Sequence, residues 1–289
     1  MDGINKFDQY AEQIFEVNLQ QKYNNLKMYS MSATGASLIL ISFSICSTVL
    51  INIGFESYAG HLTHITIPKM ISTLILLPFL VLSLCLRQRF VWINKAIDKK
   101  RRLLSKAITE NVDSSFLYNE ILTFVEMVRD KHANLCSMCK NLNKAYHVQF
   151  LSIMLKSVIS ITIGVFYGGA TILHGRFEFG FLFFPLTEAL VSAIQTLVLT
   201  LVCSETIIQA ERSAELIHNL SSTNNSSGYR GFKKRINLEI VFFSLQMLHN
   251  KVEFTALHMF PIKEKMLVSI VATIITYLII AIQMSMLNK

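Results

Sequence analysis

Residue types that bind metal ions come closest together at Cys136 and Cys139, one helical turn after His132. A tetrahedral zinc site needs about four ligands, and no second C-x-x-C or H-x-x-x-H pattern supplies the missing ones. A packed helical stripe explains the two cysteines with fewer assumptions. We therefore expect no metal ion and no other cofactor.

Catalysis has no visible motif in this chain. The sequence contains no P-loop, G-x-G-x-x-G, G-x-S-x-G or H-E-x-x-H pattern, which would cradle phosphates, present a nucleophile or hold a zinc ion. We expect that the protein is not an enzyme.

Polar side chains inside long apolar blocks are more informative, because each is costly in a bilayer unless it meets water, a cavity or a partner. Glu188, one turn after Pro185, and Gln195 lie on nearly the same helix face of one block. We hypothesise that both line a water-accessible cavity and contact a small-molecule ligand, with interhelical hydrogen bonds as the alternative. Lys156, in the preceding block, lies near that block's inner end, from which its ammonium can extend to the interface.

The last apolar block carries three polar side chains, Thr276, Tyr277 and Gln283. Thr276 and Gln283 are seven residues apart, so they share a helix face. A bundle of such helices would turn this face toward a common axis. Apolar residues beside a ring of glutamines would then form a constriction that gates by dewetting. Ordinary interhelical packing is the alternative.

The composition indicates a membrane protein. The 289 residues are 52% hydrophobic and 16% charged, against about 25% charged residues in an average soluble domain. The apolar residues gather in blocks of roughly 20, the length that a helix needs to cross a bilayer. We predict an all-α, polytopic helical membrane protein that forms a single domain over residues 1–289. Five transmembrane helices are expected, at 33–53, 66–86, 150–173, 181–203 and 266–286.

Lysine and arginine are concentrated in two segments, 87–149 and 205–262. Because cytoplasmic loops retain such residues, we predict that both segments form a cytoplasmic helical base, with the N-terminus cytoplasmic and the C-terminus extracellular. The net charge of +8 then reflects topology, and we expect no nucleic-acid partner. The basic run Lys99–Arg102 could bind anionic lipid, although topology alone accounts for it. We interpret the charged apolar stretch Leu238–Phe260 as an amphipathic cytoplasmic helix.

Thr276-Tyr277, followed by five apolar residues and Gln283, resembles the TYhhhhhQF signature of insect gustatory receptors, with Met284 where Phe is usual. The stretch Phe242–Ile262 is similar to that family's helix before the last span, with His258 where many members have Gly. Its matching positions are Phe243, Leu245, Gln246, Phe254, Thr255, Ala256 and Phe260. A segment leading into the third predicted span matches at His132, Leu135, Cys136, Asn143, Tyr146 and Gln149.

The resemblance implies a seven-helix taste receptor in the plasma membrane, one subunit of a ligand-gated non-selective cation channel that detects small-molecule tastants. It implies a homo- or hetero-tetramer with related receptors, in which the last helix lines the pore. Thr276, Tyr277 and Gln283 would then be pore or gate residues. No shared motif defines the ligand contacts, so Glu188 and Gln195 stay our own hypothesis.

The chain departs from the family in having five expected spans where seven are usual, and we expect that the first and second are the missing pair. A truncated, non-functional receptor is one alternative interpretation. Another is a multispan transporter or structural component, although a transporter is disfavoured because the sequence has no internal inverted repeat. The identity of the tastant is not encoded in any motif.

Overall fold

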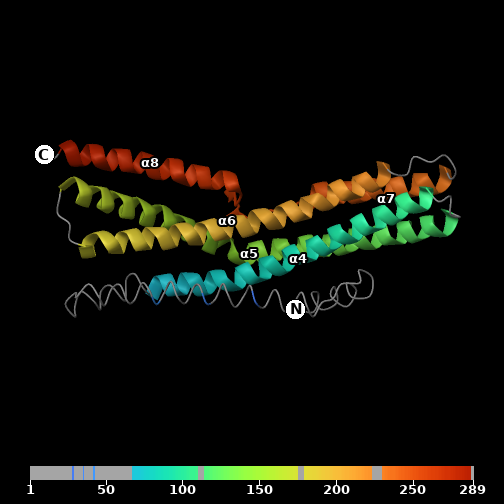
Figure 1. Ribbon diagram of the computed structural model, residues 1–289, viewed down its shortest axis with the longest axis horizontal. Helices are drawn as coiled ribbons and strands as arrows, with labels where there is room; N and C mark the ends of the chain where they lie inside the picture. Colours follow the sequence, from blue (N-terminus) through green and yellow to red (C-terminus); the bar gives the residue numbers. More distant parts are fainter. Residues whose placement is uncertain are drawn as a thin grey trace. The chain divides into compact units, whose positions relative to one another are not determined.

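The computed structural model describes residues 67–109, 114–174, 179–222 and 230–287, with the isolated positions Met28, Gly35 and Ser42. Nearly all of these residues are helical (Figure 1). In chain order the elements are α4 (Ile67–Thr109), α5 (Ser114–His174), α6 (Phe179–Ser222), α7 (Arg230–His249), β1 (Thr255–Ala256), β2 (Phe260–Pro261) and α8 (Glu264–Leu287). The prediction of an all-α fold is confirmed, apart from the short hairpin of β1 and β2.

Three of the described helices, α4, α5 and α6, are long and apolar enough to cross a membrane. They coincide with the second, third and fourth predicted spans. Helix α8, with 24 residues, coincides with the fifth predicted span. The first predicted span, 33–53, lies outside the described residues apart from two isolated positions. The chain is thus a polytopic helical membrane protein.

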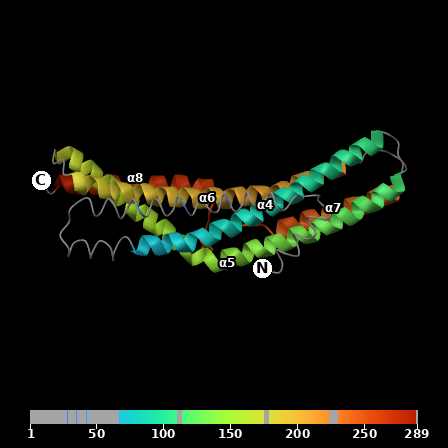
Figure 2. The same cartoon turned by 60° about the horizontal axis from the view of Figure 1, so that its bottom comes forward.

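Helices α4 and α5 are continuous through both their apolar and their polar parts (Figure 2). They have 43 and 61 residues, whereas a span needs only about 20. The polar part of each helix therefore extends beyond its apolar block. In the sequence this same polar part carries the helical apolar stripe and the basic residues predicted for the cytoplasmic base.

The contacts among the described residues divide the chain into two compact units. Unit 1 comprises Leu82–Lys144 and Glu205–Phe254, and unit 2 comprises the part of α4 up to Val81, Ala145–Ser204 and the segment that begins at Thr255. Unit 1 closely matches the two basic segments, and unit 2 holds most of the apolar blocks. The prediction of a single domain over the whole chain stays a prediction.

Aromatic packing and small polar contacts hold unit 2 together. The buried ring of Phe79 on α4 lies 4.7 Å from the ring of Phe150 and 5.3 Å from that of Tyr146 on α5, between centroids. The buried hydroxyl of Ser157 on α5 donates to the carbonyl of Ser192 on α6 at 3.1 Å. Small residues at such a contact allow the two helix backbones to approach closely.

A buried amide joins α4 to α6 in unit 1. The side-chain nitrogen of Asn94 donates to the carbonyl of Gln209 at 2.9 Å, and its side-chain oxygen accepts from the hydroxyl of Ser213 at 2.7 Å. Asn94 is only 5% exposed. Because a buried amide is costly without partners, these hydrogen bonds set the register of the two helices.

The predicted helix over Leu238–Phe260 is wrong in its second half, because α7 ends at His249 and a hairpin follows. The hairpin pairs Thr255 with Pro261 and Ala256 with Phe260. Val252, Phe254 and Ala256 are buried here, so the alternation of buried side chains is that of an extended segment and not of a helix.

Candidate functional site

Helix α8 presents a polar face that the rest of the described chain leaves exposed. Ser269, Thr273, Thr276 and Gln283 follow one another at spacings of three, four or seven residues, so they form one stripe along the helix. All four are exposed. Tyr277, beside this stripe, is 54% exposed. The three sequence-predicted pore residues are therefore together on the accessible side of α8.

A second exposed face of α8 is purely aliphatic. It consists of Val268, Val271, Ile275, Ile279 and Ile282, and Val268 is 72% exposed. The chain itself packs against a third face, where Ile274 is buried and Ile270 and Leu278 are partly covered. Thus the helix has one face toward its own chain and two chemically different faces available to lipid or to other subunits.

The hydroxyls of the polar face already use their protons within the helix. Thr273 donates to the carbonyl of Ser269 at 2.8 Å, and Thr276 donates to the carbonyl of Ala272 at 2.9 Å. This bonding to the preceding turn is common for threonine in helices. It leaves oxygen lone pairs as the groups that the stripe can offer to a neighbour, and lone pairs attract cations.

The hairpin before α8 contacts α5 within unit 2. The backbone N–H of Leu257 donates to the carbonyl of His147 at 3.2 Å, and the rings of His147 and His258 lie 5.3 Å apart between centroids. Leu257 and His258 have φ values of 48° and 58°, and the N–H of Met259 donates to the carbonyl of Ala256. These are the φ signs of a type I′ turn, which ordinarily favours Asn and Gly.

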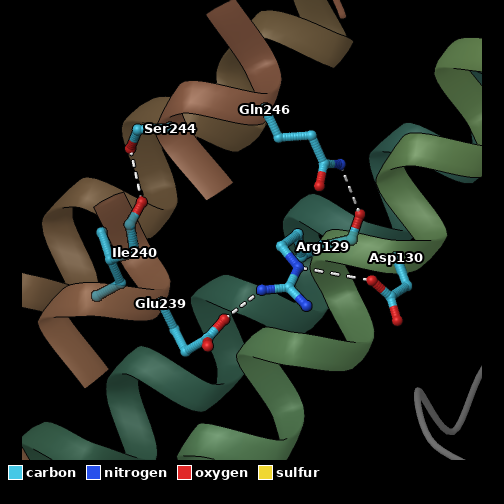
Figure 3. Close-up of polar contacts among 6 residues, drawn as sticks. All are labelled: Arg129, Asp130, Glu239, Ile240, Ser244 and Gln246. Carbon is cyan, nitrogen blue, oxygen red and sulfur yellow. Dashed lines mark hydrogen bonds and ion pairs between the residues drawn. The ribbon is translucent and has the colours of Figure 1, made fainter. Parts of the chain in front are cut away.

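In unit 1, Arg129 of α5 makes polar contacts with two residues of α7 (Figure 3). The guanidinium of Arg129 donates to the carboxylate of Glu239, and its backbone carbonyl accepts from the side-chain amide of Gln246 at 3.1 Å. Arg129 also lies 3.5 Å from the carboxylate of Asp130. Gln246 is one of the positions that resemble gustatory receptors, and here its amide joins α7 to α5.

His132 is buried among apolar and polar groups of unit 1. Its Nε2 lies 3.2 Å from the carbonyl of Ala210, and its Nδ1 lies 3.4 Å from the sulfur of Cys136. A carbonyl only accepts, so Nε2 carries the proton and the thiol donates to Nδ1. The rings of Phe90 and Phe243 meet the imidazole edge-on at 5.3 and 5.4 Å. Burial lowers the pKa of His132 to about 4, so the ring is neutral.

The two cysteines beside it are poor metal ligands in this environment. Burial raises the pKa of both the Cys136 and the Cys139 thiol well above the usual range, whereas a metal ion binds the thiolate. Within the described ranges, no group of three or more His, Cys, Asp and Glu side chains is arranged to hold a metal ion.

The sequence-predicted ligand residues each contact another helix of unit 2. Glu188 on α6 lies 3.8 Å from the ammonium of Lys156 on α5, and the amide of Gln195 donates to the hydroxyl of Thr73 on α4 at 2.8 Å. These are interhelical contacts of the kind given above as the alternative. The ligand role of both residues stays a prediction.

Several of these contacts were not foreseen from the sequence. The opposite charges of Lys156 and Glu188 in adjacent apolar blocks were a usable signal, because two such charges favour pairing in a bilayer. The sequence did not indicate the buried role of Asn94, since an asparagine in a basic helical segment is expected to face solvent. Only the packing of α4 on α6 reveals its role.

A 7tm chemosensory receptor family model matches residues 4–288. The Drosophila melanogaster protein described as gustatory receptor 28b is 23% identical over 199 residues, which are 65% of this chain and 40% of that protein. The solved structure of the insect olfactory receptor OR5 from Machilis hrabei covers 98% of this chain and 79% of its own, with 13% identity and a TM-score of 0.49. The chain belongs to the 7tm chemosensory receptor family.

Proposed function

We propose that this chain is a gustatory receptor subunit of a ligand-gated, non-selective cation channel in the plasma membrane, and that α8 lines the ion path. The polar stripe of Ser269, Thr273, Thr276 and Gln283 carries the proposal, because it is exposed although α8 is a membrane-length apolar helix. A polar stripe is costly against lipid. That cost disappears when four copies turn the stripe toward a shared aqueous axis.

The two exposed faces of α8 fit the two environments of a pore helix. The aliphatic face suits lipid or a neighbouring subunit, and the polar face suits water and ions. Since Thr273 and Thr276 use their protons inside the helix, their oxygens would meet passing ions as acceptors, which favours cations over anions. Tyr277, beside the stripe, would stand at the gate together with Gln283.

Cysteine accessibility tests the pore assignment. Thr276→Cys and Gln283→Cys probe the polar face, and Ile275→Cys and Ile279→Cys are matched controls on the aliphatic face. Whole-cell currents would be recorded with sugars and bitter compounds, with and without co-expressed related receptors, before and after a charged thiol reagent. We expect block at the first pair, little change at the second, and no change in the unsubstituted chain. Equal effects on both faces would contradict the pore assignment.

An absence of current under all these conditions, from a chain that reaches the cell surface, would favour the alternative of a non-channel membrane protein. The same cells report orientation. Epitope tags on intact cells should be accessible to antibody at the C-terminus and inaccessible at the N-terminus, as the distribution of lysine and arginine predicts.

We further propose that a small-molecule tastant contacts Glu188 and Gln195. The ion pair with Lys156 supports this, because a ligand that donates a hydrogen bond to the carboxylate of Glu188 can share it with the ammonium of Lys156, so that neither charge loses its partner. Glu188→Cys and Gln195→Cys should react with external thiol reagents, and a bound tastant should slow the reaction. If neither cysteine is accessible in a chain that reaches the cell surface, the ligand proposal is contradicted. Glu188 and Gln195 would then have only an interhelical role.

A further inference from the structure

A hollow in unit 1 lies between α4 and α6 and has a volume of about 790 Å³. This lies within the range of roughly 300–1,000 Å³ that is typical of small-molecule sites. We call it the basic groove. It is lined by six lysines and arginines, namely Lys95, Lys99, Arg101, Arg102, Lys106 and Arg212. Its two carboxylates are Asp98 and Glu215, so positive charge is in clear excess.

The positive charges are ordered along one face of α4. Lys95, Lys99, Arg102 and Lys106 follow at spacings of four, three and four residues, which places them on one stripe. Like charges at these spacings repel and weaken a helix. Asp98 offsets only part of the repulsion, through its ion pairs with Arg101 and Arg102 at 2.8 and 2.7 Å.

Membrane topology explains how many cations this segment carries, but it does not require them to line a hollow. Lys100, in the middle of the same run, shows the difference. It points to α5, where its ammonium lies 2.5 Å from the carboxylate of Glu120. By contrast, Lys95 on α4 and Arg212 on α6 form no hydrogen bond or ion pair with any other residue that the structure describes. Within the described part of the chain, two cations on opposite walls of the groove are therefore available to an anion.

The other residues that line the groove restrict the class of ligand that it can bind. Gln209 and Asn219 supply polar groups, and none of the described residues that line the groove is aromatic. Single-stranded nucleic acids are held largely by stacking of bases on aromatic rings, so this groove suits a ligand that is rich in phosphates and lacks a base. We propose that the basic groove binds a polyphosphate anion of the inositol phosphate class, either as a soluble molecule or as the headgroup of a membrane lipid.

The test uses the full chain in nanodiscs, so it does not depend on channel activity. One arm titrates inositol hexakisphosphate into phosphatidylcholine nanodiscs by calorimetry. The other arm measures the thermal unfolding midpoint in nanodiscs that contain phosphatidylinositol bisphosphate or, at equal charge, phosphatidylserine. Binding in the first arm identifies a soluble anion, and selective stabilisation by the phosphoinositide identifies a lipid headgroup. Either result supports the proposal.

Two triple variants locate the site. Lys95→Gln, Lys99→Gln and Arg212→Gln together remove three groove cations, and Lys144→Gln, Lys234→Gln and Arg235→Gln remove three exposed cations of unit 1 outside the groove. We expect the groove variant to lose at least about tenfold in affinity, because hydrogen bonds to charged groups are strong. The control should stay within about threefold of the unsubstituted chain, since distant surface charges are screened by salt.

Three results would overturn the proposal. The first is no binding in either arm. The second is equal weakening of both triple variants. The third is equal stabilisation by phosphatidylserine with no binding of the soluble anion, which would identify a nonspecific basic surface. Circular dichroism of each variant checks that its helices have formed, and glutamine retains good helix propensity at these exposed positions.

Discussion

The ammonium of Lys156 lies 3.8 Å from a carboxylate oxygen of Glu188, joining α5 to α6. Their side chains are 29% and 11% exposed, and both lie within predicted spans. A lone charge at such a position is costly, whereas a paired charge is tolerated. In the sequence, each of these two charges looks costly to bury. In the structure, the ion pair between them reduces that cost for both.

Removing one member of this pair should destabilise the protein more than removing both. Glu188→Gln leaves the ammonium of Lys156 without its counter-charge, and we expect a loss of about 3 kcal/mol. Lys156→Met should cost a similar amount, and the double variant should recover most of it. The free energy of unfolding in detergent micelles, measured for all four chains, gives the coupling energy. Additive losses would show that the two side chains do not interact.

The amide of Asn94 should be hard to replace. Asn94→Leu keeps the branching and the number of heavy atoms of the side chain but leaves the carbonyl of Gln209 and the hydroxyl of Ser213 without their partner, at an expected cost of about 2 kcal/mol. Asn141→Leu, at an exposed position of α5, is the control and should change stability by about 0.5 kcal/mol or less. Denaturant unfolding measures both. Similar effects of the two substitutions would contradict the role of Asn94.

Stability should fall as the pH drops from about 6.5 toward 4, because of His132. Burial lowers the pKa of His132 from 6.5 to about 4. Between these two pH values, the histidine therefore binds a proton in the unfolded chain but stays neutral in the folded chain. The full contribution is present above pH 6.5, and up to about 3 kcal/mol is lost at the acid end. Unfolding midpoints measured across this pH range test the prediction.

The control for this prediction is His132→Gln, which can still donate to the carbonyl of Ala210 but has no proton to gain. It should be less stable than the unsubstituted chain near neutral pH, because the aromatic contacts are lost. The slope of its stability between pH 6.5 and 4 should be much shallower. An unchanged slope would assign the acid sensitivity to other groups.

Replacing His258 with glycine should relieve backbone strain in the turn before α8. His258 has a φ of 58°, a left-handed conformation that costs a residue with a Cβ atom roughly 1–2 kcal/mol. His258→Gly and His258→Ala both lose the ring contact with His147, but only glycine is freed from this strain. We expect the glycine variant to be more stable than the alanine variant by about 1 kcal/mol. Thermal unfolding compares them, and an alanine variant of equal or greater stability would refute the strain.

The helical membrane architecture was predictable from the sequence, because hydropathy and helical spacing are local properties. Blocks of about 20 apolar residues require helices in a bilayer, where backbone groups cannot be satisfied by water. The apolar positions of α5 and the membrane-length α8 were predicted for this reason. The same reasoning wrongly predicted that the helix continues after His249. A short apolar run is compatible with either a helix or an extended segment.

What the sequence by itself determined is where the helices form, which of them are long enough to span a bilayer, and that Thr276 and Gln283 share a face of α8. Only the tertiary structure decided which polar groups meet. It pairs Lys156 with Glu188, buries Asn94 between α4 and α6, and leaves the polar stripe of α8 uncovered. The physical reason is that periodicity depends on neighbours along one helix, whereas the cost of burying a charge or an amide depends on the partners that a different helix brings within hydrogen-bonding distance.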